Sequence, residues 1–260
     1  MRVLVTRPAA QARDWVARFE AQGIDAAALP LIAIEPPDDT AVVQAAWRDL
    51  AARRLAVFVS PNAVAQFFRQ RPTGCGWPDG VLAAAPGPGT GAALREAGVP
   101  TAAVLEPPAA SPSFDSEALW PVLQAAGPWA GRSVLVLRGS VDGEALGRGR
   151  EWLAQQLRAA GATVDFVVAY RRAAPRFDAA QQACWQAALA APREHLWLLS
   201  SSEALDQLEA LAPGAWGPAQ ALATHARIAE RARSAGFGRV IEAPPAWPAV
   251  LAAVGQAAGG

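Results

Sequence analysis

The chain has 260 residues, enough for two domains of ordinary size, and apolar residues make up 52% of it. Its formal net charge is zero and its pI is about 6.8, so it lacks the basic surplus that is typical of nucleic-acid-binding proteins. It contains no lysine, which excludes a Schiff-base lysine, a lysine-anchored pyridoxal phosphate and the lysine of a Walker A loop.

Cysteine and histidine are scarce. Cys75 and Cys184 lie far apart, as do His195 and His225, so a zinc site is not expected. Two separate cysteines favour free thiols in a reducing compartment. The first residues enter an apolar strand without a signal peptide, and no apolar run reaches the length of about 18 residues that crosses a membrane. We therefore expect a cytoplasmic, soluble protein that contacts neither membranes nor nucleic acids.

Short apolar runs alternate with amphipathic segments along the whole chain. The apolar runs predict strands at residues 2–6, 24–34, 55–60, 81–85, 101–105, 133–137, 161–171, 196–199, 220–223 and 240–241. Helical periodicity predicts helices at residues 11–22, 42–50, 61–68, 92–97, 117–126, 150–160, 177–190, 226–235 and 247–258, with a further helix that ends at residue 211. This alternation predicts an α/β fold with parallel sheets, and the strands are too many for one sheet over one core.

Two weak internal repeats support a pair of doubly wound domains. The first matches residues 3–7 and the helix that follows them with residues 134–138 and the helix after those. The second matches residues 57–98 with residues 198–236, each running from a strand and a serine to a helix that ends in Ala-Gly. The alternative is that any doubly wound sheet resembles itself.

Polar side chains lie at the carboxyl ends of the predicted strands, where open α/β sheets bind their ligands. They are Arg7, Ser60, Gly87–Thr90, Arg138, Ser200–Ser202 and Thr224. The hydroxyl residues can be N-caps, and free N–H groups at helix starts can also bind anions. The two arginines can form salt bridges or hold carboxylates with two hydrogen bonds each.

Two further features leave alternatives open. Gly87–Gly91 resembles a dinucleotide loop but reads G-x-G-x-G, and the carboxylate at Glu106 is followed by two prolines. Tyr170, the only tyrosine of the chain, ends the strand at residues 161–171. A free tyrosine has a pKa of about 10, so its hydroxyl is protonated at neutral pH and can donate a proton, although such a residue is often structural.

Several segments match one known family in order and spacing: residues 3–8 (VLVTRP), 30–36, 57–64 (VFVSPNAV), 87–98, 115–119, 134–139 (VLVLRG), 161–172 and 223–236. On these segments the chain resembles the uroporphyrinogen-III synthase family nearly end to end. The resemblance implies domain 1 at residues 1–34 plus 173–260, domain 2 at residues 37–166 inserted in it, and linker strands at about residues 31–36 and 167–172.

The resemblance also implies a lyase of heme biosynthesis that needs no cofactor. Its small-molecule substrate would be hydroxymethylbilane, a linear tetrapyrrole with eight carboxylates. The substrate loses its hydroxyl as water, its ring D is inverted, and it closes to uroporphyrinogen III in the cleft between the domains. We expect a monomer, with at most a transient contact to the preceding enzyme of the pathway.

The same resemblance places a general acid at Tyr170, at the hinge and facing both domains. It places substrate contacts at Arg7, Ser60, Asn62, Thr90, Arg138, Gly139, Ser200, Ser201, Ser202, Thr224 and His225. The chain departs from the family at Ser201, where many members have proline, and at Arg227 and Ile228, where some have threonine, so that Thr224 is the substitute candidate. Residues 141–149 read as an insertion. The alternatives are a nucleotide-dependent enzyme that uses Gly87–Gly91 and a non-catalytic protein that binds tetrapyrroles or other anions.

Overall fold

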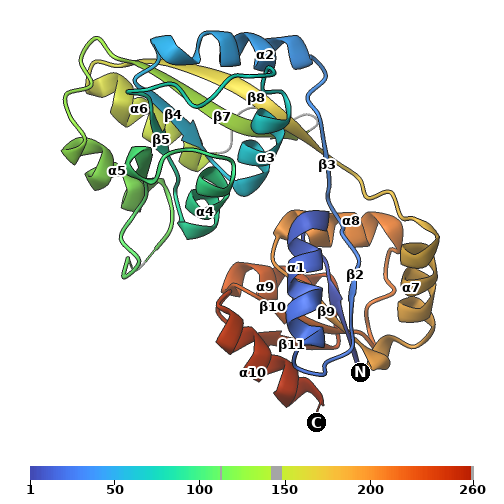
Figure 1. Ribbon diagram of the computed structural model, residues 1–260. Coiled ribbons are helices and arrows are strands. Elements are labelled where there is room, and N and C mark those ends of the chain that lie inside the picture. The colour runs from blue at the N-terminus through green and yellow to red at the C-terminus, as the bar shows by residue number, and fades with distance from the viewer. Residues whose placement is uncertain (112, 142–147, 259–260) are drawn as a thin grey trace. The chain divides into compact units, whose positions relative to one another are not determined.

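The computed structural model describes residues 1–111, 113–141 and 148–258 (Figure 1). The chain forms two compact units. Unit 1 comprises Met1–Ala33 and Ala173–Gly260, and unit 2 comprises Ile34–Arg172. The chain thus leaves unit 1 once and returns to it once, so unit 2 is inserted in unit 1. None of the helices in the described ranges has the length and apolar character needed to span a bilayer.

Unit 1 contains, in its described residues, a five-stranded parallel sheet. Its strands lie in the order β11 (Arg239–Glu242), β10 (Gln220–Ala223), β9 (His195–Leu199), β1 (Arg2–Val5) and β2 (Ala26–Ala28). Its helices are α1 (Ala9–Glu20), α7 (Ala179–Ala190), α8 (Ser202–Leu211), α9 (Ala226–Ser234) and α10 (Trp247–Ala258), with a 3-10 turn η3 (Pro192–Glu194).

Unit 2 contains a six-stranded sheet among the residues that the structure describes. Its strands lie in the order β3 (Ala33–Glu35), β8 (Thr163–Ala173), β7 (Ser133–Val141), β4 (Leu55–Phe58), β5 (Leu82–Ala84) and β6 (Val104–Leu105). The five strands from β8 to β6 pair in parallel. Its helices are α2 (Thr40–Arg48), α3 (Pro61–Arg69), α4 (Pro88–Glu96), α5 (Ser116–Ala125) and α6 (Arg148–Ala159), with 3-10 turns η1 (Leu50–Ala52) and η2 (Thr101–Ala103).

The two sheets have the same strand order once the internal repeats are used to match them. The first repeat equates β1 with β7, and the second equates β9 with β4. The order β11-β10-β9-β1-β2 then corresponds to β6-β5-β4-β7-β8, and every helix between these strands has a counterpart. The chain enters the shared fold at a different strand in each unit, and the predicted α/β class with two doubly wound sheets of similar topology is confirmed.

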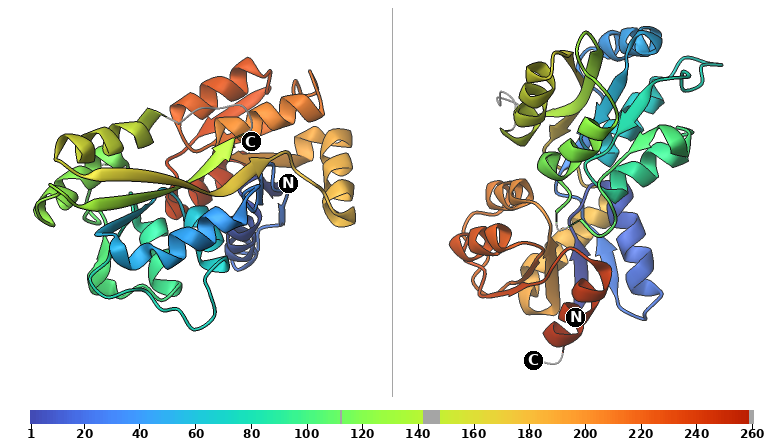
Figure 2. Two further views of the ribbon diagram at one scale, coloured as in Figure 1. Left: turned by 90° about the horizontal axis from the view of Figure 1, so that it is seen from above. Right: turned by 90° about the vertical axis from the view of Figure 1, so that its left-hand side faces the viewer.

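Both sheets are covered by helices on each face, as Figure 2 shows. In unit 2, one apolar cluster joins the sheet to α2, α3 and α4 through Trp47, Phe67 and Leu94. A second cluster joins the other face to α5 and α6 through Leu123 and Leu157. Side chains alternate between the faces along each strand, so the strand residues divide between the two clusters.

Several elements differ from the sequence-based expectation. Residues 24–34 form two strands, because Pro30, which has no N–H group, lies between β2 and β3. Residues 101–103, expected as strand, form η2 after Pro100. The strands β7 and β8 continue past their expected ends because they pair with each other as far as Val141 and Arg172.

The expected linker segments are therefore largely strands of the sheet of unit 2. Residues 167–172 form the second half of β8, and β3 lies beside β8. Arg171 reinforces this edge, because its guanidinium Nη2 lies 2.7 Å from the carboxylate of Glu35. Most of the expected insertion at residues 141–149 lies outside the described residues.

Two glycines that end helices of unit 2 allow a matched test of the fold. Gly98 after α4 and Gly161 after α6 have positive φ values of +97° and +87°. A Cβ atom at Gly98 would meet nothing within 4 Å, whereas one at Gly161 would lie 2.9 Å from the Cα atom of Ala130. We expect Gly98→Ala to lower the free energy of unfolding by about 1–2 kcal/mol through backbone strain alone, and Gly161→Ala to lower it further. Urea denaturation of both variants checks this, and equal losses would contradict the close approach of Ala130 to Gly161.

Candidate active site

The predicted site residues gather at the carboxyl edge of each sheet, where parallel α/β folds bind ligands. In unit 1 the connections from the strands diverge between β1 and β9, and in unit 2 they diverge between β4 and β7. Open α/β sheets bind their ligands at such switch points, outside the carboxyl ends of the strands. Arg7 and Ser200–Ser202 follow the first pair of strands. Ser60 follows β4, and Arg138–Gly139 lie in the part of β7 that extends beyond the end of β4.

Arg7 is a partly buried cation at the switch point of unit 1. Its guanidinium carbon lies 4.6 Å from the ring centroid of Trp15 on α1, and its Nε is buried with no hydrogen-bond partner among the described residues. Burial lowers the pKa of the Arg7 guanidinium, because the charged form loses hydration. A cation in this state gains from an anionic ligand that supplies both charge and hydrogen-bond acceptors.

The hydroxyl groups of unit 1 differ from simple N-caps. Ser201 occupies the N-cap position of α8, but its side chain makes no capping hydrogen bond. The hydroxyl of Ser202 is buried and has no partner among the described residues. The start of α8 therefore presents N–H groups and a hydroxyl that a ligand could use.

The start of α9 is capped by a residue other than the predicted one. His225, rather than Thr224, is the N-cap, and its Nδ1 accepts a hydrogen bond of 3.1 Å from the backbone N–H of Arg227. Thr224 follows β10 directly, and it is buried. The prediction that Thr224 starts this helix is wrong by one residue, since the imidazole performs the capping.

Ser60 is the N-cap of α3 in unit 2. Its Oγ accepts a hydrogen bond of 3.2 Å from the backbone N–H of Ala63, and it lies 3.1 Å from the Oη of Tyr170. Asn62 lies in the first turn of the same helix and is partly buried. Thr90 is buried within the first turn of α4, whose N-cap is Gly87, so Thr90 does not begin that helix.

Tyr170 lies deeper than expected. The side chain is fully buried within the apolar cluster on the α3 side of the sheet. Its hydroxyl has one hydrogen-bond partner in the described part of the chain, the partly buried Ser60. The resemblance placed this phenol at a hinge, facing both domains, and that placement stays a prediction; within unit 2 the buried phenol contacts the hydroxyl of Ser60.

Arg138 and Tyr170 are not brought together. The guanidinium carbon of Arg138 lies 4.8 Å from the ring centroid of Phe166, which packs against the cluster of α5 and α6. Tyr170 belongs to the cluster on the opposite face. Because neighbouring residues of a strand point to opposite faces, Gly139 rather than Arg138 lies on the tyrosine side.

Sequence reasoning missed the aromatic supports of the two arginines. Arg7 and Arg138 are equivalent in the first repeat, and each rests on a ring, Trp15 or Phe166. Such a stacked guanidinium is held in place by cation–π attraction. The helix tryptophan that follows Arg7 was an available signal for the first contact, whereas Phe166 lies on the paired strand β8 and no local pattern indicated it.

The glycine-rich start of α4 is explained by packing. A Cβ atom at Gly91 would lie 1.8 Å from the Oε2 of Glu106, and the other carboxylate oxygen of Glu106 forms an ion pair with Arg95. The carboxylate that a ribose would need is thus bound within unit 2. This arrangement weakens the alternative of a dinucleotide site at Gly87–Gly91.

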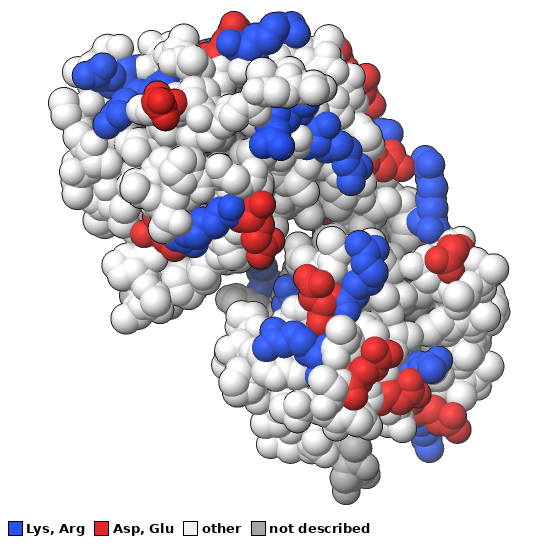
Figure 3. Space-filling model, in the orientation of Figure 1, with Lys and Arg blue, Asp and Glu red and all other residues white. Residues whose placement is uncertain are grey.

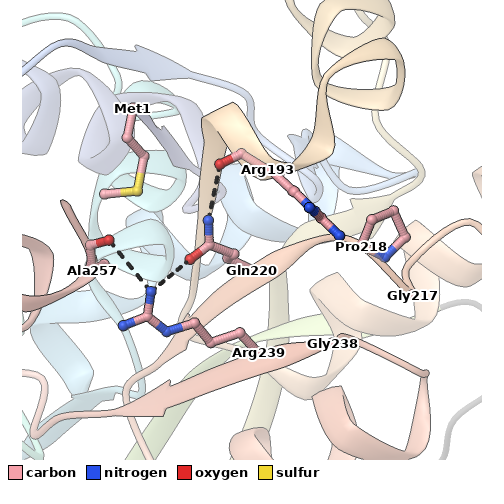
Figure 4. Close-up of a pocket in the computed structure, with 8 residues that line it drawn as sticks. All are labelled: Met1, Arg193, Gly217, Pro218, Gln220, Gly238, Arg239 and Ala257. Atoms are coloured by element: carbon pink, nitrogen blue, oxygen red, sulfur yellow. Dashed lines mark hydrogen bonds between the residues drawn. The ribbon is translucent and has the colours of Figure 1, made fainter. Parts of the chain in front are cut away.

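A pocket of about 520 Å³ lies at the opposite end of the sheet of unit 1 (Figure 4). Gln220 and Arg239, the first residues of β10 and β11, line this pocket. The Nη1 of Arg239 donates a hydrogen bond of 3.1 Å to the Oε1 of Gln220. Its lining includes none of the predicted site residues. The described residues contain no group of three or more His, Cys, Asp or Glu side chains that could hold a metal ion.

Comparison with known proteins shows the fold and the family of this chain. A crystal structure of a mutant uroporphyrinogen III synthase from the extremely thermophilic bacterium Thermus thermophilus matches 100% of this chain and 99% of its own, with 19% identity and a TM-score of 0.56. The crystal structure of the uroporphyrinogen-III synthetase from Helicobacter pylori matches 98% of this chain and 99% of its own, with 15% identity and a TM-score of 0.59. These likenesses establish the shared fold. The family model described as uroporphyrinogen-III synthase HemD matches residues 13–251, and the chain therefore belongs to the uroporphyrinogen-III synthase family.

Proposed function

We propose that this chain is a cofactor-free lyase that converts hydroxymethylbilane to uroporphyrinogen III. The family assignment makes it an enzyme of heme biosynthesis. The observation that carries the finer proposal is the hydroxyl pair of Tyr170 and Ser60, 3.1 Å apart at the switch point of unit 2. It offers a proton donor in a largely apolar setting at the edge where α/β sheets bind ligands.

The first chemical step requires a proton. The C–O bond of the hydroxymethyl group breaks, its electron pair leaves with the oxygen, and the oxygen takes one proton to depart as water. The pyrrole nitrogen stabilises the carbon that remains. Ring D is inverted when the methylene carbon bonds to the α-carbon of ring D that already carries the bridge to its neighbour, the bond from that α-carbon to the bridge breaks, and the bridge bonds to the free α-carbon of ring D. That carbon releases one proton, so the donor can be reprotonated.

The hydrogen bonds around Ser60 indicate how this proton can be delivered. The N–H of Ala63 can only donate to the Oγ of Ser60. If the phenol of Tyr170 also donates to this oxygen, the hydroxyl proton of Ser60 is free to point toward a ligand. We therefore assign Ser60 as the group that contacts the leaving hydroxyl and Tyr170 as the proton source behind it.

The carboxylates of the substrate require several separate anion contacts rather than one basic patch. The chain has no lysine, and Figure 3 shows arginine and acidic side chains interspersed over the displayed face. Arg7, the hydroxyl of Ser202 and the uncapped start of α8 provide such contacts in unit 1. Arg138, Ser200, Asn62, Thr90, Thr224 and His225 are further candidates for contacts along the two edges.

The direct test is to supply the purified protein with hydroxymethylbilane and to separate the porphyrin isomers after oxidation. We expect mainly isomer III. Isomer I alone, the product of spontaneous closure, would refute the synthase proposal and leave a tetrapyrrole-binding protein. Stabilisation by a dinucleotide would instead favour the nucleotide-dependent alternative.

Removing either hydroxyl of the pair should slow the reaction. Tyr170→Phe deletes the proton donor, and Ser60→Gly deletes the relay while keeping a residue that is tolerated at an N-cap. Because general acids typically contribute about 100-fold or more and this leaving group departs readily, we expect kcat to fall about 10- to 100-fold in each variant. The double variant should lose little more than either single variant, and losses that multiply would refute a shared proton path.

Replacing Arg7, the partly buried cation of unit 1, should weaken substrate binding. A hydrogen bond to a charged group contributes about 1.5–3 kcal/mol, so Arg7→Gln should raise KM about 10-fold or more with a smaller change in kcat. Arg13→Gln, which alters an exposed arginine of α1, is the matched control and should leave KM unchanged. An unchanged KM in Arg7→Gln would remove this residue from the substrate site.

A further inference from the structure

The ring of Tyr170 lies directly against the backbone of Gly139. A Cβ atom added at Gly139 would lie 2.4 Å from Cζ, 2.5 Å from Cε2 and 2.9 Å from Oη of the tyrosine. All three distances are shorter than side chains tolerate, and the atoms involved belong to the reactive end of the ring. The phenol ring occupies the space that a side chain at residue 139 would need.

The backbone at Gly139 has no other need for glycine. Its φ is not among the positive values found at the turn glycines of the described chain. Any residue could therefore adopt this conformation, and the requirement for glycine comes from the neighbouring ring alone. This differs from Gly98 and Gly161, where positive φ values favour glycine.

An irregularity in β8 turns Tyr170 toward Gly139. Arg138 pairs with Val168 and Gly139 pairs with Tyr170, so Ala169 is an extra residue between the two pairs. Regular alternation would place Tyr170 on the same face as Phe166, because they are four residues apart. The bulge reverses this alternation, and both Ala169 and Tyr170 join the cluster on the α3 side.

We infer that Gly139 is a positioning residue. Together with the bulge at Ala169, it allows the phenol of Tyr170 to lie within hydrogen-bond distance of the hydroxyl of Ser60. This inference rests on the proposed function for its catalytic meaning, but its geometry does not. It differs from the direct substrate contact that the family resemblance suggested for Gly139. A side chain at this position would displace the donor by blocking its ring, without touching the substrate.

The single tyrosine provides a direct readout of this geometry. Protein labelled with ¹³C at the tyrosine Cζ gives one protein signal, whose chemical shift reports the hydrogen bond of Tyr170. We expect the signal to move in Ser60→Gly, and to move or broaden in Gly139→Ala. Gly76→Ala is the matched control, because a Cβ atom there meets nothing within 4 Å, and it should leave the signal unchanged.

The catalytic consequence is tested in the same variants. We expect Gly139→Ala to lower kcat and the fraction of isomer III about as much as Tyr170→Phe, and to cause little further loss in the Tyr170→Phe background. An unchanged tyrosine signal, or a full additional loss in that background, would overturn the positioning role. If the wild type makes no isomer III, the synthase proposal fails, while the signal in Gly139→Ala still decides whether Gly139 places the ring.

A variant that does not fold can still answer the question. If Gly139→Ala is unstable, Gly139→Ala/Tyr170→Leu removes the ring from the contact and should recover the melting temperature while synthase activity stays low. Recovery of stability would identify the phenol as the obstructing group. Failure to recover would show that the cost lies elsewhere in β7 and would overturn the inference.

Discussion

Strand β8 pairs with β7 through nine residue pairs and extends beyond the ends of β4 and β5. This long ladder determines much of unit 2. It holds β3 at the sheet edge, it sets Gly139 opposite Tyr170, and its bulge decides which face the phenol joins. A pairing shifted by one residue would turn the tyrosine away from Ser60. The geometry of the hydroxyl pair is therefore a property of strand register as much as of residue identity.

The shared strand order of the two units gives them equivalent edges with different chemistry. Each has an arginine near an aromatic ring on one central strand or just after it, and a serine at the start of the helix that follows the neighbouring central strand. Matching the strands through their registers equates Ser60 with Ser201, one residue later than the repeat at Ser200 suggested. Ser60 caps its helix and contacts a phenol, whereas Ser201 makes no capping bond. In the proposed function, one edge would supply a proton donor, while the other would offer its N–H groups and Arg7 to anions.

The sequence predicted the parts of this structure that depend on local pattern. Short apolar runs located strands such as β4 and β9. The positions after them located the edge residues, because parallel strands place their carboxyl ends together. It did not predict the burial of Tyr170 or its separation from Arg138, because an extra residue in a strand leaves no mark on composition. It also assigned residues 167–172 to a linker, since pairing with β7 is a long-range property. The sequence identified Gly139 only as part of a motif. Its positioning role could be inferred only from the place of the Tyr170 ring, which lies 31 residues later in the chain.

The burial of the phenol is compatible with proton donation because a partly exposed hydroxyl stands beside it. A tyrosine within an apolar cluster is shielded from water, and its single polar contact in the described residues directs its proton toward Ser60. The serine is in turn fixed by the N–H of Ala63 at the positive end of the α3 dipole. That dipole disfavours positive charge near the serine, so the relay should transfer a proton in step with C–O cleavage rather than hold it. In this proposal the phenol regains its proton when ring closure releases one from a pyrrole carbon.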